Sequence, residues 1–171
     1  FNVSARSPES GILGDSNCGG FFAAAMRKAG FERLIILGRA KKPSYLLLED
    51  GKISILSADG LWGRRIIEAQ EQLKARHGAG TVSAVIGPSG ENLVRMAAIM
   101  TGKKNAAGRG GMGAVMGSKN IKAIAARGGE AIEVAQKDTL RALRVKQQEE
   151  LKSSRIVQVL GKVGTPLLYE V

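Results

Sequence analysis

The stretch 105–120, NAAGRGGMGAVMGSKN, is the part of the sequence best suited to bind an anion. It places a single arginine, Arg109, among five glycines and then continues into small residues that favour a short helix. Glycine lets the backbone approach a ligand closely and adopt positive φ angles. Unpaired N–H groups at the start of a helix bind phosphate, and an arginine adds a forked donor for the same oxygens. The pattern therefore predicts a loop that holds phosphate or a similar oxyanion.

Two common nucleotide-binding motifs do not explain this loop. Gly108, Gly110 and Gly113 satisfy GxGxxG, but the dinucleotide fingerprint needs a buried strand just before it. The preceding residues are TGKKNAA, for which we predict no strand. A P-loop would need GxxxxGK followed by Ser or Thr, and the sequence has no such run. The loop therefore indicates another kind of phosphorylated ligand.

The sequence gives little material for catalysis by side chains. Carboxylates such as Asp15 and Glu91 are scattered among polar turns, where we expect them to be solvated. The only cysteine, Cys18, has no second cysteine beside it, and the only histidine is His77. We therefore assign no catalytic residue and interpret Cys18 as a small neutral residue. His77 is predicted to lie at a solvated helix end.

A second stretch, GDSNCGGFFAAAMRKAG at 14–30, shares its plan with the first. Each has a glycine pair, a short helix of small residues, a lysine and then a predicted buried strand, at 34–38 and at 121–128. The shared plan predicts an internal repeat about a pseudo-twofold axis, which would offer two similar cradles to one ligand. Chance recurrence of glycine, helix and strand is the alternative explanation.

The other elements indicate an α+β fold with mixed β-sheets and short helices. We expect a hairpin at 44–56 that turns at Asp50 and Gly51, and a helix at 61–77 ended by Gly78. A charged amphipathic helix is predicted at 136–153. We predict a domain at 1–135, incomplete at its start because residue 1 begins directly in a strand. Residues 136–171 are predicted to be a helical segment that leads into a following domain, absent here.

The charge balance predicts a polyanionic partner. The chain has 26 Lys and Arg against 15 Asp and Glu, a net charge of +11. Aromatic residues make up only 4%, which disfavours the stacking platforms that bind single-stranded nucleic acid. No apolar run approaches the roughly 20 residues of a membrane span, and a single free cysteine suits a reducing cytoplasm. A basic domain that binds nucleic acid or a nucleotide, and a non-catalytic fragment, are the alternative functions.

Several long motifs, in order, resemble one enzyme family. AAGRGGMGAVMGSKNIKAIA closely resembles the motif of the N-terminal domain of the tungsten-containing aldehyde ferredoxin oxidoreductase family. Further matches are SPESGILGDSNCGGFF, AGFERLIILGRAKKPSYLLLEDGKISI, LWG, IGPSGENLVRMAAIM and VGTPLLYEV. The resemblance covers nearly the whole chain.

The resemblance implies a cofactor-binding domain of an oxidoreductase. The family holds tungsten, less often molybdenum, between two pterins whose phosphates share a magnesium ion. Its enzymes oxidise aldehydes to carboxylic acids and pass electrons through a 4Fe-4S cluster to ferredoxin or an iron–sulfur subunit, and a homodimer is a further expectation. The family's cluster cysteines lie beyond Val171, so the cluster is expected only in the full-length protein, and this chain alone is expected to be inactive.

The resemblance also implies the residues of the cofactor site. The backbone carbonyls of two residues match ligands of the magnesium ion, namely Asn17 and Ala106. The other positions match contacts to the pterins and their phosphates: Gly19, Gly20, Asn105, Gly108, Arg109, Gly110 and Gly111. The family pattern has Arg where this sequence has Asn105 and often Ser where it has Cys18, so backbone contacts are expected there rather than side-chain contacts.

Overall fold

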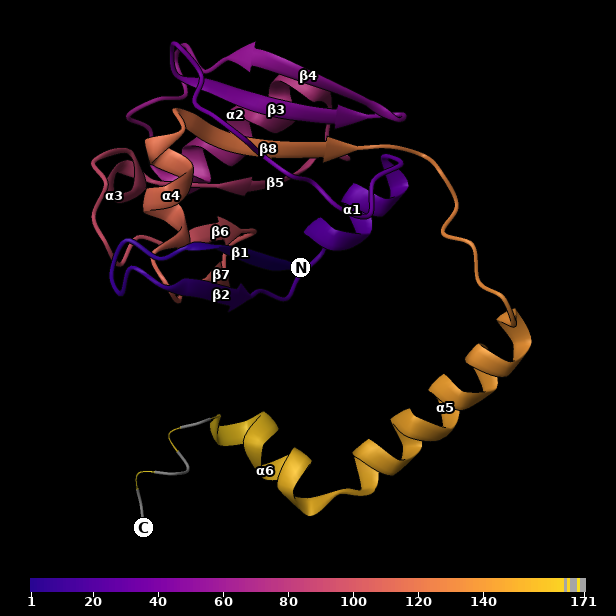
Figure 1. The fold of residues 1–171 in the computed structure, drawn as a ribbon. Coiled ribbons are helices and arrows are strands. Elements are labelled where there is room, and N and C mark those ends of the chain that lie inside the picture. Colours follow the sequence, from indigo (N-terminus) through magenta and orange to yellow (C-terminus); the bar gives the residue numbers. More distant parts are fainter. Residues whose placement is uncertain (165, 167–168, 170–171) are drawn as a thin grey trace. The chain divides into compact units, whose positions relative to one another are not determined.

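The fold is known from a computed structural model that describes residues 1–164, 166 and 169. Contacts divide the chain into two compact units, residues 1–132 and residues 133–171. The first unit has a six-stranded sheet, a separate two-stranded hairpin and four short helices (Figure 1). This arrangement confirms the predicted α+β class with mixed sheets.

The large sheet has the strand order β4-β3-β8-β5-β6-β7. Its neighbours are antiparallel except β3 and β8, which are parallel. The strands are β3 Ser44–Glu49, β4 Lys52–Ser57, β5 Val82–Val85, β6 Ile99–Thr101, β7 Asn105–Ala107 and β8 Ile121–Arg127. The hairpin of β1 (Asn2–Arg6) and β2 (Leu13–Asn17) forms the second sheet.

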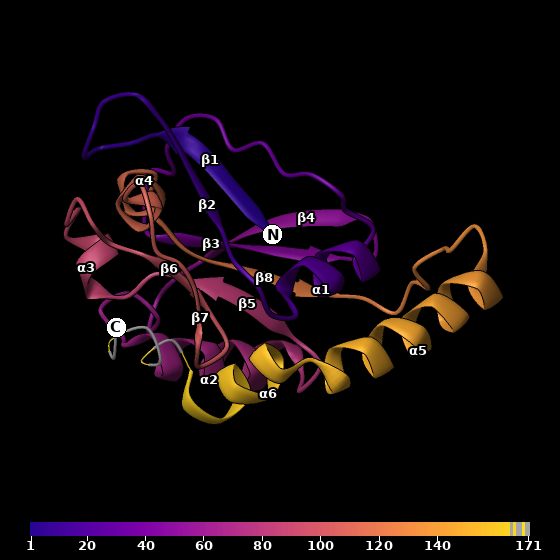
Figure 2. The same cartoon turned by 90° about the horizontal axis from the view of Figure 1, so that it is seen from below.

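Helices cover both faces of the large sheet (Figure 2). Alternate residues of β3 point to opposite faces: Tyr45 and Leu47 pack with α2 (Ile66–His77), and Leu48 packs with the other cluster. That second cluster contains residues of α1 (Phe22–Lys28) and α4 (Met112–Ser118), and the β1–β2 hairpin packs against it. A short helix, α3 (Pro88–Glu91), contacts α4. The face that carries α1, α4 and the hairpin also carries the glycine-rich stretches.

Several predicted elements are confirmed. The hairpin at 44–57 turns at Asp50 and Gly51, whose φ angles of 46° and 76° suit a turn that follows the twist of the strands. The strand predicted at 121–128 is β8, and the helix predicted at 136–153 is α5 (Lys137–Ser153).

Three local predictions were wrong. Residues 34–38 do not form a buried strand: the segment is extended without a ladder partner, and Ile35 and Leu37 are exposed. The helix predicted from residue 61 begins at Ile66, after turns at 58–63. Residues 105–107, predicted to lack a strand, form β7. β7 is the antiparallel edge strand of a tight hairpin, so the GxGxxG match still lacks the parallel strand and crossover of a dinucleotide fold.

The predicted internal repeat is not confirmed. Glycine pairs do precede both α1 and α4, and both helices contact β8. However, α4 is followed by a strand of the central sheet, whereas α1 is followed by the unpaired segment 34–38. The two stretches therefore share their first half only.

Glu91 is not solvated, in contrast to the prediction. Its side chain is 4% exposed and forms an ion pair with Lys122, whose side chain is fully buried. The carboxylate also accepts the N–H of Gly63, and Lys122 Nζ donates to the carbonyl of Arg64 at 2.7 Å. The pair thus connects α3 to β8 and to the loop before α2 inside the protein.

The environment of His77 should make the stability of the fold depend on pH. Its Nε2 lies 2.8 Å from the hydroxyl of Tyr45, and burial lowers the pKa of His77, as do Arg76 and Arg127, although Glu49 raises it. The unfolded chain binds the proton with a pKa of about 6.5. Because the folded state binds it less readily, stability is full above that pH and falls as the pH drops toward the lower folded pKa. Urea unfolding measures the free energy of unfolding between about pH 5 and pH 8, a range that spans the reference pKa of histidine.

The control is His77→Gln, which removes the only histidine of the sequence. The part of the pH dependence around neutrality should disappear in this variant. An unchanged slope would show that His77 has the same pKa in both states.

In its described residues, the second unit has two α-helices, α5 and α6 (Arg155–Val163). Their apolar side chains, including Leu143 and Leu160, are exposed. α6 lies within the helical segment predicted at 136–171, although its break from α5 at Ser154 was not predicted. The prediction that VGTPLLYEV leads into another domain falls mostly outside the described residues. In the part of the chain that the structure describes, no helix is long and apolar enough to cross a bilayer.

Candidate functional site

The structure brings the two glycine-containing stretches together at the ends of β2 and β7. The side chain of Asn105 lies against the first stretch: a Cβ added to Gly19 would lie 3.3 Å from Asn105 Nδ2, and one added to Gly20 would lie 3.0 Å from Asn105 Oδ1. The N–H of Arg109 donates to Ser16 Oγ at 3.1 Å. Residues as far apart in the sequence as Ser16 and Arg109, which are 93 positions apart, therefore meet at one local surface, and Figure 1 shows β2 and β7 close together.

The backbone carbonyl of Asn17 lies on a free edge. In the β1–β2 hairpin, Cys18 N–H donates to Phe1 O, and Asn17 is opposite Asn2 in the next pair of the register. In an antiparallel ladder, pairs of opposite residues that exchange two hydrogen bonds alternate with pairs whose N–H and C=O groups point away from the partner strand. The N–H and C=O of Asn17 therefore point away from β1. This carbonyl is available to a cation, as the predicted magnesium ligand requires.

The backbone at Gly108 is also open. A Cβ added there would contact only Ala106 Cβ, at 3.9 Å, so nothing in the fold requires glycine at this position. The neighbouring residues Ala106 and Arg109 are exposed, and the Arg109 guanidinium has no hydrogen bond or ion pair to the described residues. Backbone and guanidinium can both reach a ligand here.

Gly110 and Gly111 have a structural reason to be glycine. Both have positive φ angles, 66° and 69°. A Cβ at Gly111 would overlap the carbonyl oxygen of Arg95, and one at Gly110 would lie 3.0 Å from Met112 Cε. These contacts set the close packing of the loop before α4 and need no ligand, so the assignment of the two glycines to the cofactor stays a prediction.

The side chains near this surface do not form a metal site of their own. Within the described residues, no group of three or more His, Cys, Asp or Glu side chains converges. Cys18 is 6% exposed, and burial raises the pKa of its thiol, which disfavours the nucleophilic thiolate. A metal at this surface would be held by backbone carbonyls or by the ligand itself.

Ser16 is a site residue that the sequence did not reveal. It is 2% exposed and accepts the Arg109 N–H, which joins the loop to β2. Polar, exposed Asp15 and Asn17 flank it, and their alternation with Gly14 and Ser16 is a strand pattern. That alternation is the signal that could have identified β2 and the buried hydroxyl.

Sequence comparison identifies the family of the first unit. The N-terminal domain of aldehyde ferredoxin oxidoreductase matches residues 1–128. A tungsten-containing aldehyde ferredoxin oxidoreductase of Pyrococcus furiosus is 38% identical over 173 residues, and that of Pyrococcus abyssi is 41% identical. Both matches cover 100% of this chain but only 29% and 28% of the relatives. The chain therefore spans less than a third of their length.

Relatives with other named activities share the same domain. The WOR-like subunit of an aliphatic sulfonate oxidoreductase from Pyrococcus furiosus is 37% identical over 83% of this chain and 25% of its own length. Among solved structures, the active site complex BamBC of benzoyl coenzyme A reductase, with 1,5-dienoyl-CoA, matches with a TM-score of 0.84 and 34% identity. That match covers 88% of this chain and 23% of the other.

Proposed function

The chain belongs to the aldehyde ferredoxin oxidoreductase family as its N-terminal domain, and we propose on this premise that it is the platform for a tungsten or molybdenum bis-pterin cofactor. The observation that carries the proposal is the meeting of residues 17–20 with residues 105–109 at one exposed surface. Relatives named for three different substrates share this domain, which suits a part that holds a common cofactor rather than a substrate.

The residues present fit a ligand that has two phosphates and a shared cation. The Asn17 carbonyl points away from its ladder, Ala106 is exposed, and Gly108 has open space above it. Carbonyl oxygen is a ligand that Mg²⁺ accepts, and Arg109 can donate two hydrogen bonds to a phosphate. We propose the backbone of Asn17 and Ala106 for the cation. Gly19, Gly20, Asn105, Gly108 and Arg109 would contact the pterins and phosphates, with Gly110 and Gly111 setting the loop.

Each protein group has a defined task in this proposal. The cofactor, when bound, supplies the metal centre that changes oxidation state as the substrate is oxidised. The chain neutralises phosphate charge with Arg109 and fixes the position of the cofactor through backbone contacts on β2 and β7. Strand backbone is more rigid than a free loop, so these contacts would orient the cofactor reproducibly.

The activity of the whole protein is a wider proposal. We propose oxidation of an aldehyde to a carboxylic acid, with electrons passed through a 4Fe-4S cluster outside this chain to ferredoxin or an iron–sulfur subunit. The name and match of the Pyrococcus furiosus relative support this reaction. A cytoplasmic location and a homodimer belong to the same proposal, as does a domain at 1–135 with a helical segment at 136–171.

Arg109→Ala is expected to weaken cofactor retention. A hydrogen bond to a charged group contributes about 1.5–3 kcal/mol, which corresponds to a roughly 10- to 100-fold weaker affinity. The measurement is the ratio of tungsten or molybdenum to protein after exhaustive dialysis, with the variant made in the protein expressed from its natural gene.

Arg65→Ala is the matched control, because Arg65 is also exposed and lies just before α2. Metal retention should be unchanged in this variant. Equal retention in Arg109→Ala and in the unmodified protein would remove Arg109 from the proposed site.

A further inference from the structure

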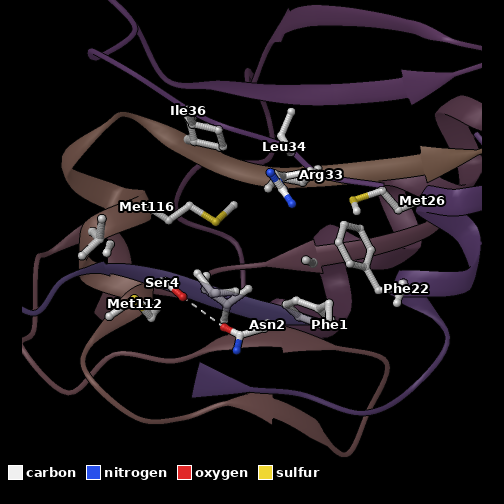
Figure 3. A pocket seen from close by; sticks show the side chains of 18 of the residues that line it. Phe1, Asn2, Ser4, Phe22, Met26, Arg33, Leu34, Ile36, Met112 and Met116 are labelled. Carbon is white, nitrogen blue, oxygen red and sulfur yellow. Dashed lines mark hydrogen bonds between the residues drawn. The ribbon is translucent and has the colours of Figure 1, made fainter. Parts of the chain in front are cut away.

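Polar groups are buried around one small pocket of the first unit. The pocket drawn in Figure 3 has a volume of about 490 Å³ and mostly apolar walls, among them methionine and phenylalanine side chains. A second pocket, of about 220 Å³, lies beside the turn that joins β6 to β7. Four of the seven polar or charged residues that are buried in the described part of the chain line this small pocket: Gln70, Thr81, Ser83 and Thr101. Buried polar groups need hydrogen-bond partners, so their concentration here indicates a polar occupant.

The small pocket is a gap at the end of the β5–β6 ladder. β5 begins at Val82, but its first residue paired with β6 is Ala84, which lies opposite Thr101. After Thr101 the chain enters a turn at Gly102, whose φ angle is 57°. Helix α2 borders the gap, because Gln70 Nε2 donates to the Gly102 carbonyl at 3.2 Å. The start of β5, the β6–β7 turn and α2 therefore form the walls of the pocket.

Thr81 has a buried hydroxyl without a partner. The residue is 1% exposed, and its Oγ1 is, among the described residues, the single buried side-chain nitrogen or oxygen that forms no hydrogen bond. An unsatisfied buried group costs free energy, so native structures usually supply a water molecule or a ligand. One water molecule occupies about 30 Å³ of the liquid, whereas the pocket has about 220 Å³. The pocket can therefore hold a small polyatomic ligand that accepts a hydrogen bond from Thr81.

The charged groups around the pocket are positive. Lys74, in the last turn of α2, lines the pocket, is exposed and has no ion-pair partner among the described residues. Lys103 and Lys104 lie in the adjoining turn. In the described part of the chain, no aspartate or glutamate lines the pocket, which disfavours a metal ion held by carboxylates. The ammonium and hydroxyl groups of the walls instead suit a ligand with negative charge and acceptor oxygens.

We propose that the small pocket binds a tetrahedral oxyanion of the size of inorganic phosphate. Lys74 supplies the positive charge, and the Thr81 hydroxyl donates to one of the oxygens. Ser83 and Thr101 add two further hydroxyls in the same walls. A hydrogen bond to an ionised group is roughly twice as strong as a neutral one, so an anion is favoured over a neutral ligand of the same size.

The pocket is a site apart from the proposed cofactor surface, although the two adjoin. Asn105 borders both, because its side chain lies against Gly19 and Gly20 and also lines the pocket. Gly108 and Arg109, which we propose for the cofactor, do not line it. The inference therefore does not rest on the proposed function.

Equilibrium dialysis of radiolabelled inorganic phosphate against the protein expressed from its natural gene tests the inference, with chloride added to keep the ionic strength constant. We expect saturable binding of about one phosphate per chain at this pocket. Lys74→Met should weaken binding roughly 10-fold, the lower limit for a hydrogen bond to a charged group, because Lys74 is exposed. Thr81→Val, which keeps the shape of the side chain, should weaken it roughly 2- to 10-fold. This second variant should not melt at a lower temperature without phosphate, because a methyl group replaces an unpartnered hydroxyl.

Lys28→Met is the matched control, because Lys28 is also an exposed lysine in the last turn of a helix and does not line the pocket. Phosphate binding should be unchanged in this variant and in Arg109→Ala. Equal binding by the unmodified protein, Lys74→Met and Thr81→Val, or no saturable binding at all, would overturn the inference. Binding that is lost in Arg109→Ala but kept in Lys74→Met would place the anion on the cofactor surface and would also overturn it. The metal content of the same preparations tests the proposed function separately.

Discussion

Gly111→Ala is expected to destabilise the chain strongly, while Gly108→Ala leaves its stability almost unchanged. A Cβ at Gly111 would overlap the carbonyl oxygen of Arg95, and the residue has a φ of 69°. A left-handed conformation costs an L-residue about 1–2 kcal/mol and overpacking about 1–3 kcal/mol, so a loss of roughly 2–5 kcal/mol is expected. Gly108 has open space, and its replacement should change stability by less than about 0.5 kcal/mol.

Urea unfolding of the 171-residue chain, followed by circular dichroism, gives both values. Comparison of the two variants distinguishes Gly111, which the packing of the fold requires, from Gly108, whose backbone is open to a ligand. Equal destabilisation by the two substitutions would show that Gly108 is constrained by the fold, and the argument for an open backbone there would fail.

Lys122→Met is expected to cost about 3–5 kcal/mol, because it leaves the buried carboxylate of Glu91 without its cation. The Lys122 side chain is fully buried, and its ammonium group bonds both to Glu91 and to the Arg64 carbonyl. The double variant Lys122→Met with Glu91→Gln should recover part of the loss, since a neutral amide can still accept the Gly63 N–H. Thermal or urea unfolding measures the difference.

Lys146→Met provides the comparison at the surface. Lys146 pairs with Glu150 at 3.9 Å, but both side chains are largely exposed. Such a pair on a helix contributes about 0.3–0.5 kcal/mol. A similar small effect for Lys122→Met would show that the Glu91–Lys122 pair does not stabilise the fold.

The sequence allowed prediction of elements whose signal is local. The turn at Asp50 and Gly51 needs positive φ angles, which favour these residue types, so the hairpin was predicted correctly. The long periodic pattern at 136–153 likewise identified a helix. The helix of residues 66–77 was placed five residues too early, because the apolar residues Leu61 and Trp62 continue the period although they lie in a turn.

Features that depend on distant partners were not predictable. Glu91 and Lys122 are 31 positions apart, and neither has a local pattern that indicates burial. Ser16 became a site residue only because β2 brings it to Arg109, 93 positions away. Residues 34–38 have the local sequence pattern of a strand, and a strand was predicted there. A strand also needs a neighbouring strand to hydrogen-bond with, and the sequence pattern does not reveal whether one is present.

The candidate site was predictable in position but not in detail. The stretches 17–20 and 105–111 were identified from glycine content and family resemblance, and the structure places them together. Which glycines face solvent and which face protein depends on contacts with Arg95, Met112 and Asn105, which no motif encodes.

Metal and pterin analysis of the protein expressed from its natural gene, in medium containing tungstate and molybdate, tests the central claim most directly. For a bis-pterin cofactor, we predict about one tungsten or molybdenum atom per protein chain and about two phosphorylated pterins for each metal atom. An enzymatically active preparation that contains neither metal nor pterin would contradict the assignment of this domain as a cofactor platform.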